Sequence, residues 1–422
     1  MFAVSLCKAV VIPVEKNLPP EGIVSLATLV SAKAIIAEND EAFSTFLHFD
    51  YKEICNICEN EEPFKPAEFP ESEACSELLF TTGTTGKSKG VELLNRSIMA
   101  VLENIITETG MKEDNIGFVP MPLNHVFAMR RFQSNLIKGA TVIIQDDLLP
   151  IKDFFKTLRT YPVTSISLVP SAISYIFAIS KDYLGSFKDQ LRYIESSSAP
   201  LSPGDKDMMH KLLPNTRLFN FYGCTESTTA CVLEYSAYIG KDYCVGKPCV
   251  NSDIQLLDTD GNIIPKGSTR EGRILLGGKA SMGGYWHEPE LTAQTLIDGY
   301  VYTNDLGYYD EEGFLYVLGR IDDVINIGGN KVSPDDVEET VMRMEEIQDC
   351  GCIGVSDKVA GNELKLYIVS DEDLQTLEPK IREHLLKSLE AFKIPKYIEK
   401  IDSIPRTYNG KIQRKKLREL NN

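Results

Sequence analysis

The stretch from residue 80 to residue 91, FTTGTTGKSKGV, combines the residue types that bind a polyphosphate. It holds three glycines, four threonines, one serine and two lysines. Glycine lets successive backbone N–H groups turn toward an anion, hydroxyls add donors, and lysines add positive charge. A solvated turn is the structural alternative, but turns seldom combine so many hydroxyls with paired lysines. The stretch therefore predicts a phosphate-binding loop.

The end of this loop is close to a P-loop but does not match one. The pattern G-x-x-x-x-G-K-[ST] could end at Gly86-Lys87-Ser88, but it requires glycine where this chain has Thr81. We therefore disfavour a P-loop NTPase.

The segments around the loop must position it, and they predict alternating strands and helices between residues 76 and 222. Short runs rich in apolar and β-branched residues are interleaved with amphipathic segments, as in parallel sheets covered by helices. The predicted strands are 78–80, 141–144, 163–169 and 217–221, and the predicted helices are 95–109, 151–160 and 203–213.

The pattern of residues changes after residue 244. Strand-like runs and turn pairs such as Asp260-Gly261 and Glu312-Gly313 predict a β-rich subdomain. A second break lies near 319–323, and beyond it two helices (335–344, 378–389) flank a strand (364–369). We predict an α/β protein with a large N-terminal domain, residues 1–320, and a small mobile α+β C-terminal domain, residues 321–422, of ordinary domain size.

Composition excludes several classes of function. The 422 residues allow more than one domain, and a net charge of −17 argues against nucleic-acid and anionic-membrane partners. No apolar run is long enough to span a membrane, so stable membrane insertion is not expected. Of the ten cysteines only Cys55 and Cys58 have metal-like spacing, and the second C-x-x-C of a zinc ribbon is absent. Scattered cysteines predict reduced thiols in a cytoplasmic protein.

A short basic cluster closes the chain, and its role stays open. A solvated tail, a tRNA-like binding segment and a set of contacts to a nucleotide or CoA are all compatible with it. Its members are Lys411, Arg414, Lys415, Lys416 and Arg418.

The phosphate loop resembles that of the adenylate-forming (AMP-binding) superfamily, whose pattern is [YF]-T-S-G-T-T-G-x-P-K-G-V. Thr82 and Ser88 depart from this pattern, but both residues are small and polar. Five further blocks of the family follow in order, and six ordered blocks are far more specific than one. They are NFYGCTE (220–226), GYW (284–286) with Pro289 and Thr292, YTNDL (302–306), GRIDDVI (319–325) with Gly328, Gly329 and Pro334, and PRT (405–407) with Gly410, Lys411, Ile412 and Arg414. The chain is similar to acyl- and aryl-CoA synthetases.

The resemblance also concerns the start of the chain. Residues 8–13, KAVVIP, resemble a stretch that normally lies well inside the first domain of family members. The resemblance therefore predicts that the usual N-terminal segment is missing.

The resemblance implies a nucleotide site. The loop would cradle the β- and γ-phosphates, Glu226 would bind Mg²⁺, Tyr222 would stack on adenine, and Asp305 with Arg320 would bind the ribose. Thr225 would reach the α-phosphate. The implied nucleotide-binding residues are Thr81, Thr82, Gly83, Thr84, Thr85, Gly86, Lys89, Ser198, Ala199, Pro200, Asn220, Phe221, Tyr222, Gly223, Thr225, Asp305 and Arg320, and the catalytic ones are Lys411, Glu226 and Thr85.

The resemblance also implies how the acid is bound. Gly223 is small where acetate-restricted relatives carry tryptophan, so the pocket accepts acids longer than acetate. No acidic residue lies near His125, which disfavours an α-amino acid. Asp322 would be the hinge about which the small domain turns, and Lys411 would bridge carboxylate and phosphate. The implied substrate-pocket residues are His125, Ser197, Gly223, Gly328 and Gly329.

The predicted function is ATP-dependent activation of a carboxylic acid to acyl-AMP, followed by transfer to a thiol, with ATP, Mg²⁺ and CoA as cofactors. A role in fatty acid metabolism is the corresponding expectation for the pathway. No carrier-domain serine motif follows the C-terminal domain, which favours CoA as the acceptor. An adenylation enzyme serving a carrier protein and a truncated, non-catalytic nucleotide-binding paralogue stay open as alternatives.

Overall fold

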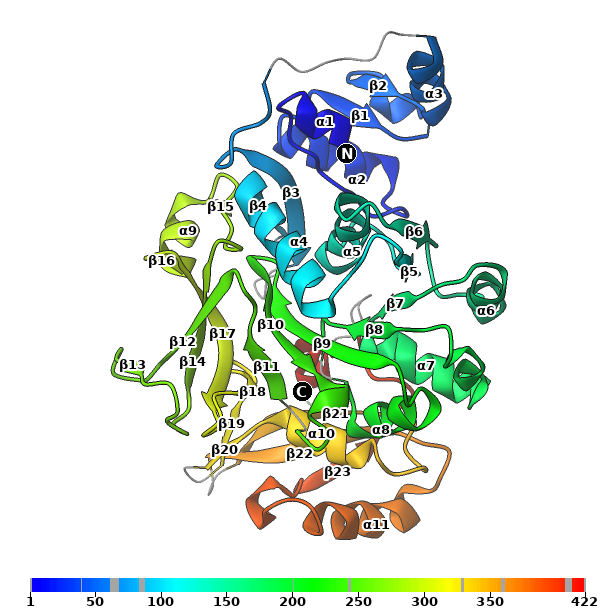
Figure 1. Ribbon diagram of the computed structural model, residues 1–422. Helices are drawn as coiled ribbons and strands as arrows, with labels where there is room; N and C mark the ends of the chain where they lie inside the picture. The colour runs from blue at the N-terminus through cyan, green and yellow to red at the C-terminus, as the bar shows by residue number, and fades with distance from the viewer. Residues whose placement is uncertain are drawn as a thin grey trace.

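The computed structural model describes residues 2–38, 40–60, 68–82, 88–199, 201–241, 244–327, 330–357, 361–406 and 412–420. Its centre is one large sheet whose first half is parallel and whose second half is antiparallel (Figure 1). Among the described residues no helix has the length and apolar character needed to cross a membrane.

The parallel half confirms the predicted alternation of strands and helices. Its strands, in spatial order, are β6 (Thr141–Ile144), β5 (Ile116–Val119), β7 (Ser165–Leu168), β8 (Tyr193–Ser196) and β9 (Arg217–Cys224). The helices are α4 (Asn95–Thr109), α5 (Val126–Ile137), α6 (Ile151–Thr160), α7 (Pro170–Ser180) and α8 (Pro203–Leu212), with the 3₁₀ segment η2 (Tyr183–Phe187). Strands β7 and β8 are buried along their whole length, as expected for parallel strands covered on both faces.

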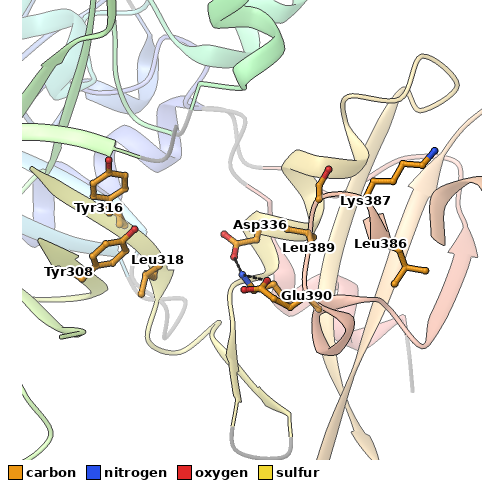
Figure 2. A pocket seen from close by; sticks show the side chains of 11 residues that line it. Tyr308, Tyr316, Leu318, Asp336, Leu386, Lys387, Leu389 and Glu390 are labelled. Atoms are coloured by element: carbon orange, nitrogen blue, oxygen red, sulfur yellow. Dashed lines mark hydrogen bonds and ion pairs between the residues drawn. The ribbon is translucent and has the colours of Figure 1, made fainter. Parts of the chain in front are cut away.

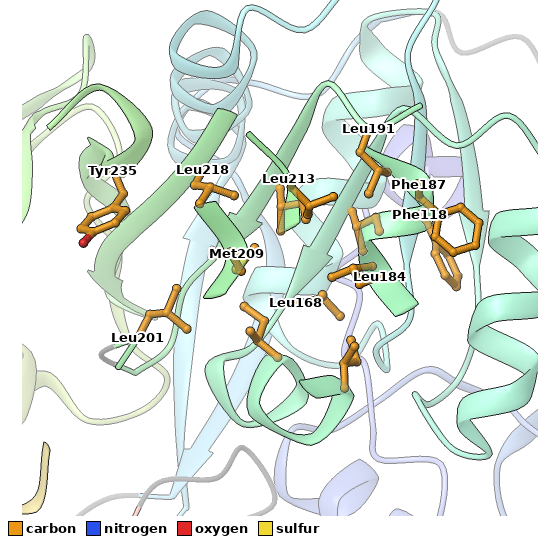
Figure 3. Packing of buried hydrophobic residues seen from close by; sticks show 14 of the residues in the cluster. Phe118, Leu168, Leu184, Phe187, Leu191, Leu201, Met209, Leu213, Leu218 and Tyr235 are labelled. Carbon is orange, nitrogen blue, oxygen red and sulfur yellow. The ribbon is translucent and has the colours of Figure 1, made fainter. Parts of the chain in front are cut away.

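The main core packs on one face of this parallel half. Phe118, Leu168 and Leu218 from the strands meet Leu184 and Met209 from the helical side (Figure 3). Each of these side chains is at least 96% buried. The core holds β5, β7, β8 and β9 in fixed register, so the residues that follow these strands are held at one edge of the sheet.

The antiparallel half forms the predicted β-rich region. Its strands, in spatial order from β9, are β10 (Ser227–Glu234), β11 (Cys244–Pro248), β18 (Leu315–Arg320), β17 (Tyr300–Tyr309), β14 (Gly272–Gly278), β12 (Ser252–Leu257) and β13 (Ile263–Ile264), and β16 (Leu296–Ile297) pairs with β17. The segment η3 (Tyr235–Ala237) follows β10. The turn pair Asp260-Gly261 joins β12 to β13, and Glu312-Gly313 joins β17 to β18, as predicted.

The predicted phosphate loop lies between two paired strands. Strand β3 (Cys75–Thr82) runs antiparallel to β4 (Ser88–Leu94), and β4 also pairs with β15 (Gly284–Tyr285), which precedes α9 (Pro289–Thr295). Thr82 is the register partner of Ser88, so both ends of the loop are fixed opposite each other.

Residues 2–60 pack at one end of the molecule, far from α11 (Figure 1). Their elements are α1 (Phe2–Leu6), α2 (Pro20–Leu29), β1 (Ala34–Ile36), η1 (Glu41–Phe43), β2 (Leu47–Phe49) and α3 (Tyr51–Asn60). Ala27, Ile35 and Phe43 form a small core of their own there.

The C-terminal part of the chain builds a separate α+β core. Its elements are β19 (Ile325–Ile327), β20 (Asn330–Val332), α10 (Pro334–Val341), β21 (Asp349–Asp357), β22 (Gly361–Val369), α11 (Leu374–Leu386), η4 (Ala391–Lys393), β23 (Tyr397–Lys400) and α12 (Arg414–Glu419). Helix α11 begins four residues before the predicted start. Asp373 caps it by accepting a hydrogen bond from the Gln375 amide, so Pro379 falls inside the helix rather than near its beginning.

Part of the basic C-terminal cluster has a structural role. The Arg414 guanidinium is 11% exposed and pairs with Asp335 and with Glu338, the latter at 2.7 Å. Arg418 pairs with Asp323 at 2.9 Å. These two arginines therefore tie α12 to the start of the C-terminal part and are not a solvated tail.

Gly246→Ala should lower the free energy of unfolding by roughly 2–4 kcal/mol, because it combines strain with a backbone clash. Gly246 has φ +92, and a Cβ there would lie 1.7 Å from the Val232 carbonyl oxygen on β10. Urea denaturation measures the change. Gly261→Ala is the matched control, since Gly261 has φ +83 but no heavy atom within 4 Å of its Cβ position. Equal losses in the two variants would contradict the clash.

Candidate functional site

The candidate site lies at the edge where the parallel strands end, which we call the carboxyl edge. In open α/β sheets ligands bind outside this edge. Ser197 and Ser198 follow β8, and Tyr222 lies near the end of β9. The Ser197 hydroxyl donates to the Phe221 carbonyl at 2.9 Å, which ties the two strand ends together. His125 is exposed and lies on the loop after β5, at the residue before α5.

Ser198 has a backbone conformation that favours glycine. Its φ is +82, which lies in the left-handed region. Non-glycine residues in the left-handed region cost of order 1–2 kcal/mol, and such strain clusters at functional sites. The turn from Ser197 to Ala199 therefore holds a strained residue directly after β8, as functional sites often do.

On the neighbouring strands β8 and β9, two buried polar atoms near this edge lack hydrogen-bond partners among the described residues. They are Ser196 Oγ on β8 and Asn220 Oδ1 on β9. The two residues are register partners, so their side chains lie on the same face of the sheet. Buried polar atoms are normally paired, so unpaired ones next to a predicted nucleotide site fit a polar ligand.

Tyr222 and Asp305 are joined directly. The Tyr222 hydroxyl donates to Asp305 Oδ2 at 2.6 Å, across 83 residues of sequence. Burial, and then the Asp305 charge, raise the pKa of the Tyr222 phenol, which keeps it a donor. Arg320 is the register partner of Asp305 on β18 and is exposed. The residues assigned to adenine and to ribose are therefore neighbours in space.

Asp322 lies in the short segment between β18 and β19. Its carboxylate accepts a hydrogen bond from Asn304 Nδ2 at 2.9 Å and lies 4.0 Å from the Arg320 guanidinium. Both contacts tie Asp322 to the large sheet. Its role as a hinge stays a prediction.

Glu226 faces the phosphate-loop strands through Tyr285. The Tyr285 hydroxyl donates to Glu226 Oε1 at 2.7 Å, and Lys89 Nζ lies 5.5 Å from the centre of the Tyr285 ring. Burial, followed by the Glu226 charge, raises the pKa of Tyr285. The Trp286 amide donates to the Gly90 carbonyl at 2.8 Å, which fixes this segment against β4.

The carboxylates of Glu226 and Asp305 both affect the side chain of Cys224. Cys224 is half-buried, and desolvation is the first cause of its raised pKa; the charges of Glu226 and Asp305 are the next. Both acids are thus within electrostatic reach of the same side chain at the end of β9.

The protein oxygen atoms at this site could bind Mg²⁺ only together with oxygen atoms from a bound ligand. Glu226 supplies one carboxylate, and the described residues contain no cluster of three or more acidic, histidine or cysteine ligands. Mg²⁺ commonly binds through one or two carboxylates plus phosphate oxygens and water. The site therefore fits Mg²⁺ that arrives with a nucleotide.

Several predicted residues lie outside the described part of the chain, or are described only in part. Thr81 is half-buried, and only the backbone of Thr82 is described; Thr225 is half-buried in the turn between β9 and β10. Outside the described residues lie Gly83, Thr84, Thr85, Gly86, Pro200, Gly328, Gly329 and Lys411.

Gly223 has a local reason to be glycine. A Cβ at this position would lie 2.7 Å from the Thr229 amide nitrogen and 2.8 Å from the Ser227 carbonyl oxygen, both in the backbone of β10. The β9–β10 hairpin therefore excludes a side chain in the present conformation. The role of Gly223 in the length of the acid pocket stays a prediction.

A cavity of about 520 Å³ lies elsewhere, between the large sheet and the C-terminal part (Figure 2). On one side of the cavity the rings of Tyr308 and Tyr316 stack with their centres 5.0 Å apart. On the other side Lys393 Nζ pairs with Asp336 Oδ2 at 3.0 Å. None of the predicted site residues that the structure describes lines this cavity. Its position does not alter the assignment of the site to the carboxyl edge.

Tyr285 is the residue that the sequence reasoning did not assign. Its signal was present, because the GYW block was identified but given no role.

Two family profiles and several known proteins match this sequence. The sequence profile of the family described as AMP-binding enzyme matches residues 1–286, and that of the AMP-binding enzyme C-terminal domain matches residues 336–411. The 2-succinylbenzoate–CoA ligase of Bacillus cereus (strain Q1) is 28% identical over 427 residues, covering 100% of this chain and 85% of the relative. The ligase of the same name from Bacillus mycoides (strain KBAB4) is 28% identical over 430 residues, with the same coverage of each chain.

Solved structures share the fold. The o-succinylbenzoate CoA synthetase (MenE) of Bacillus subtilis, in complex with its acyl-adenylate intermediate, superposes with a TM-score of 0.84 at 22% identity, covering 98% of this chain and 84% of that one. ATP-bound MatB from Rhodopseudomonas palustris superposes with a TM-score of 0.85 at 22% identity and the same coverage.

Proposed function

The chain belongs to the AMP-binding enzyme family, and on that premise we propose that it activates a carboxylic acid with ATP and transfers the acyl group to CoA. In the first step the acid's carboxylate oxygen attacks the α-phosphorus of ATP, forming acyl-AMP and releasing pyrophosphate. In the second step the CoA thiol attacks the acyl carbon, forming the thioester and releasing AMP. The chain is thus an acid–thiol ligase that uses ATP, Mg²⁺ and CoA.

The observation that carries this proposal is that Glu226 and Asp305 both lie near the end of β9. Each is held by a tyrosine hydroxyl, at 2.7 Å from Tyr285 and 2.6 Å from Tyr222. One carboxylate, with its two acceptor oxygens, binds a vicinal diol well. A second carboxylate is needed to bind a metal ion that carries phosphates. A nucleoside polyphosphate presents both groups at once.

The residues of the chain supply orientation and charge. Two anions must meet in the first step, so donors and cations around the α-phosphate stabilise the developing charge. Thr225, Lys89 and the loop after β3 are assigned to the phosphates, and Lys411 to the contact between carboxylate and phosphate. Mg²⁺, when bound through Glu226, would neutralise charge on the phosphate oxygens.

The proposal also covers the acid substrate, the acyl acceptor and the cellular location of the protein. The sequence favours fatty and aryl acids, and relatives named for 2-succinylbenzoate add that acid to the candidates. The ten cysteines are free thiols, which supports a cytoplasmic location.

The test is a pyrophosphate-release assay with the purified chain. We expect release that depends on both ATP–Mg²⁺ and an acid, measured across fatty acids, aryl acids, 2-succinylbenzoate and amino acids. Mass spectrometry should then detect the acyl-CoA when CoA is added. Acyl-AMP that reacts with a purified carrier protein but not with CoA would reassign the acceptor. ATP binding without pyrophosphate release for any acid would contradict the proposed reaction.

A further inference from the structure

A buried ion pair lies one layer beneath the carboxyl edge. Arg131 Nε on α5 donates to Glu195 Oε2 on β8 at 2.5 Å, and the two side chains are 1% and 2% exposed. The guanidinium carbon lies 4.5 Å from the centre of the Phe127 ring and 4.6 Å from that of Phe221. The arginine is therefore held between two aromatic rings by a carboxylate.

The pair is close to the predicted acid site. Glu195 precedes Ser197 by two residues on β8, which places it about 7 Å from the edge at the strand rise of about 3.3 Å per residue. Arg131 follows His125 by six residues, about 9 Å along the helix at a rise of 1.5 Å per residue. Phe221, which stacks on Arg131, also accepts the hydrogen bond from Ser197. The pair thus underlies the strand ends assigned to the acid.

One donor of this arginine is unsatisfied. Arg131 Nη2 is buried and has no hydrogen-bond partner among the described residues. Leaving a buried donor unpaired is costly, more so when the group is charged. An acceptor that enters with the substrate would remove this cost.

We propose that Arg131 and Glu195 determine which acid is bound, favouring acids with a neutral oxygen acceptor, such as a ketone or hydroxyl, part-way along the tail. This inference rests on the proposed function and names the substrate class of that site. A hydrocarbon tail leaves Nη2 unpaired. A second carboxylate would add a buried negative charge next to Glu195, whose own charge already offsets that of Arg131.

The test compares two acids of equal chain length, hexanoate and 5-oxohexanoate. Calorimetry on the full chain saturated with AMP measures binding without turnover. We expect 5-oxohexanoate to bind at least about 10-fold more tightly, the order expected for a hydrogen bond to a charged group. Equal affinities, or no binding of either acid to the folded AMP-loaded protein, would overturn the inference.

Variants of Arg131 and Glu195 test whether this ion pair itself causes the preference for the oxo acid. The double variant R131L/E195L removes both charges together and leaves no lone buried charge, a change that buried pairs often tolerate. It should lose the preference for the oxo acid while ATP–Mg²⁺ still raises its melting temperature. An unchanged preference in this variant would refute the role of the pair. Arg131→Lys, which keeps a charge but loses the planar fork, should reduce the preference without abolishing acid binding.

A second buried pair on the same helix gives a matched control. Arg130 pairs with Glu77 of β3 at 2.7 Å, and the two side chains are 1% and 2% exposed. The double variant R130L/E77L should keep the wild-type preference between the two acids. Absence of pyrophosphate release with every acid, alongside a retained binding preference, would contradict the proposed reaction and support the selectivity inferred here.

Discussion

Replacing Glu226 by glutamine should reduce acid-dependent pyrophosphate release roughly 100- to 1,000-fold, the loss typical of removing one preorganised electrostatic contact in a transition state. Glutamine keeps the shape of the side chain and an acceptor for the Tyr285 hydroxyl but removes the negative charge assigned to Mg²⁺. The variant should also need a higher Mg²⁺ concentration for half-maximal activity. Steady-state assays over a Mg²⁺ titration measure both effects.

Tyr285→Phe is the matched control for this prediction. It leaves the Glu226 carboxylate in place and removes only the hydrogen bond of 2.7 Å that orients it. We expect a much smaller loss and little change in the Mg²⁺ requirement. Wild-type activity and Mg²⁺ dependence in Glu226→Gln would exclude Glu226 as the metal carboxylate.

Replacing Lys411 by alanine should reduce formation of acyl-AMP by a factor of roughly 100 or more, for the same electrostatic reason. The transfer of the acyl group from preformed acyl-AMP to CoA should change little, because a contact made only in the first transition state accelerates only that step. Single-turnover assays of each half-reaction, one from ATP and acid and one from acyl-AMP and CoA, measure the two effects separately.

Lys415→Ala provides the matched lysine control. Lys415 is exposed on α12, four residues further along the chain. We expect both half-reactions to keep their wild-type rates in this variant. Equal losses in the two half-reactions of Lys411→Ala would argue against a role confined to adenylate formation.

The local elements were determined by the sequence itself. Helices α4 and α6 begin and end where periodicity placed them, at 95–109 and 151–160, and β6 matches the predicted strand 141–144. The reason is that amphipathic spacing and β-branched runs act over short distances and are little altered by tertiary packing. The phosphate loop was recognisable for the same reason, since its glycines, hydroxyls and lysines are contiguous.

Some local features could not be predicted, because their cause is not local. Helix α11 begins at Leu374, four residues before the predicted start, because the Asp373 side chain caps it. Gly223 was interpreted from its position in a family block, whereas its Cβ position is occupied by the backbone of the neighbouring strand β10. Contacts of this kind depend on the pairing of strands rather than on composition.

The sequence alone predicted which residues would bind the nucleotide and the acid, and the tertiary structure decided which side chains meet. Tyr222 reaches Asp305 across 83 residues, Tyr285 reaches Glu226 across 59, and Arg131 reaches Glu195 across 64. Each pair joins separate elements: two strands of the large sheet, a short strand with the turn after β9, and a helix with a strand. Burial in the packed interior fixes these side chains against one another, and no spacing along the chain encodes that distance.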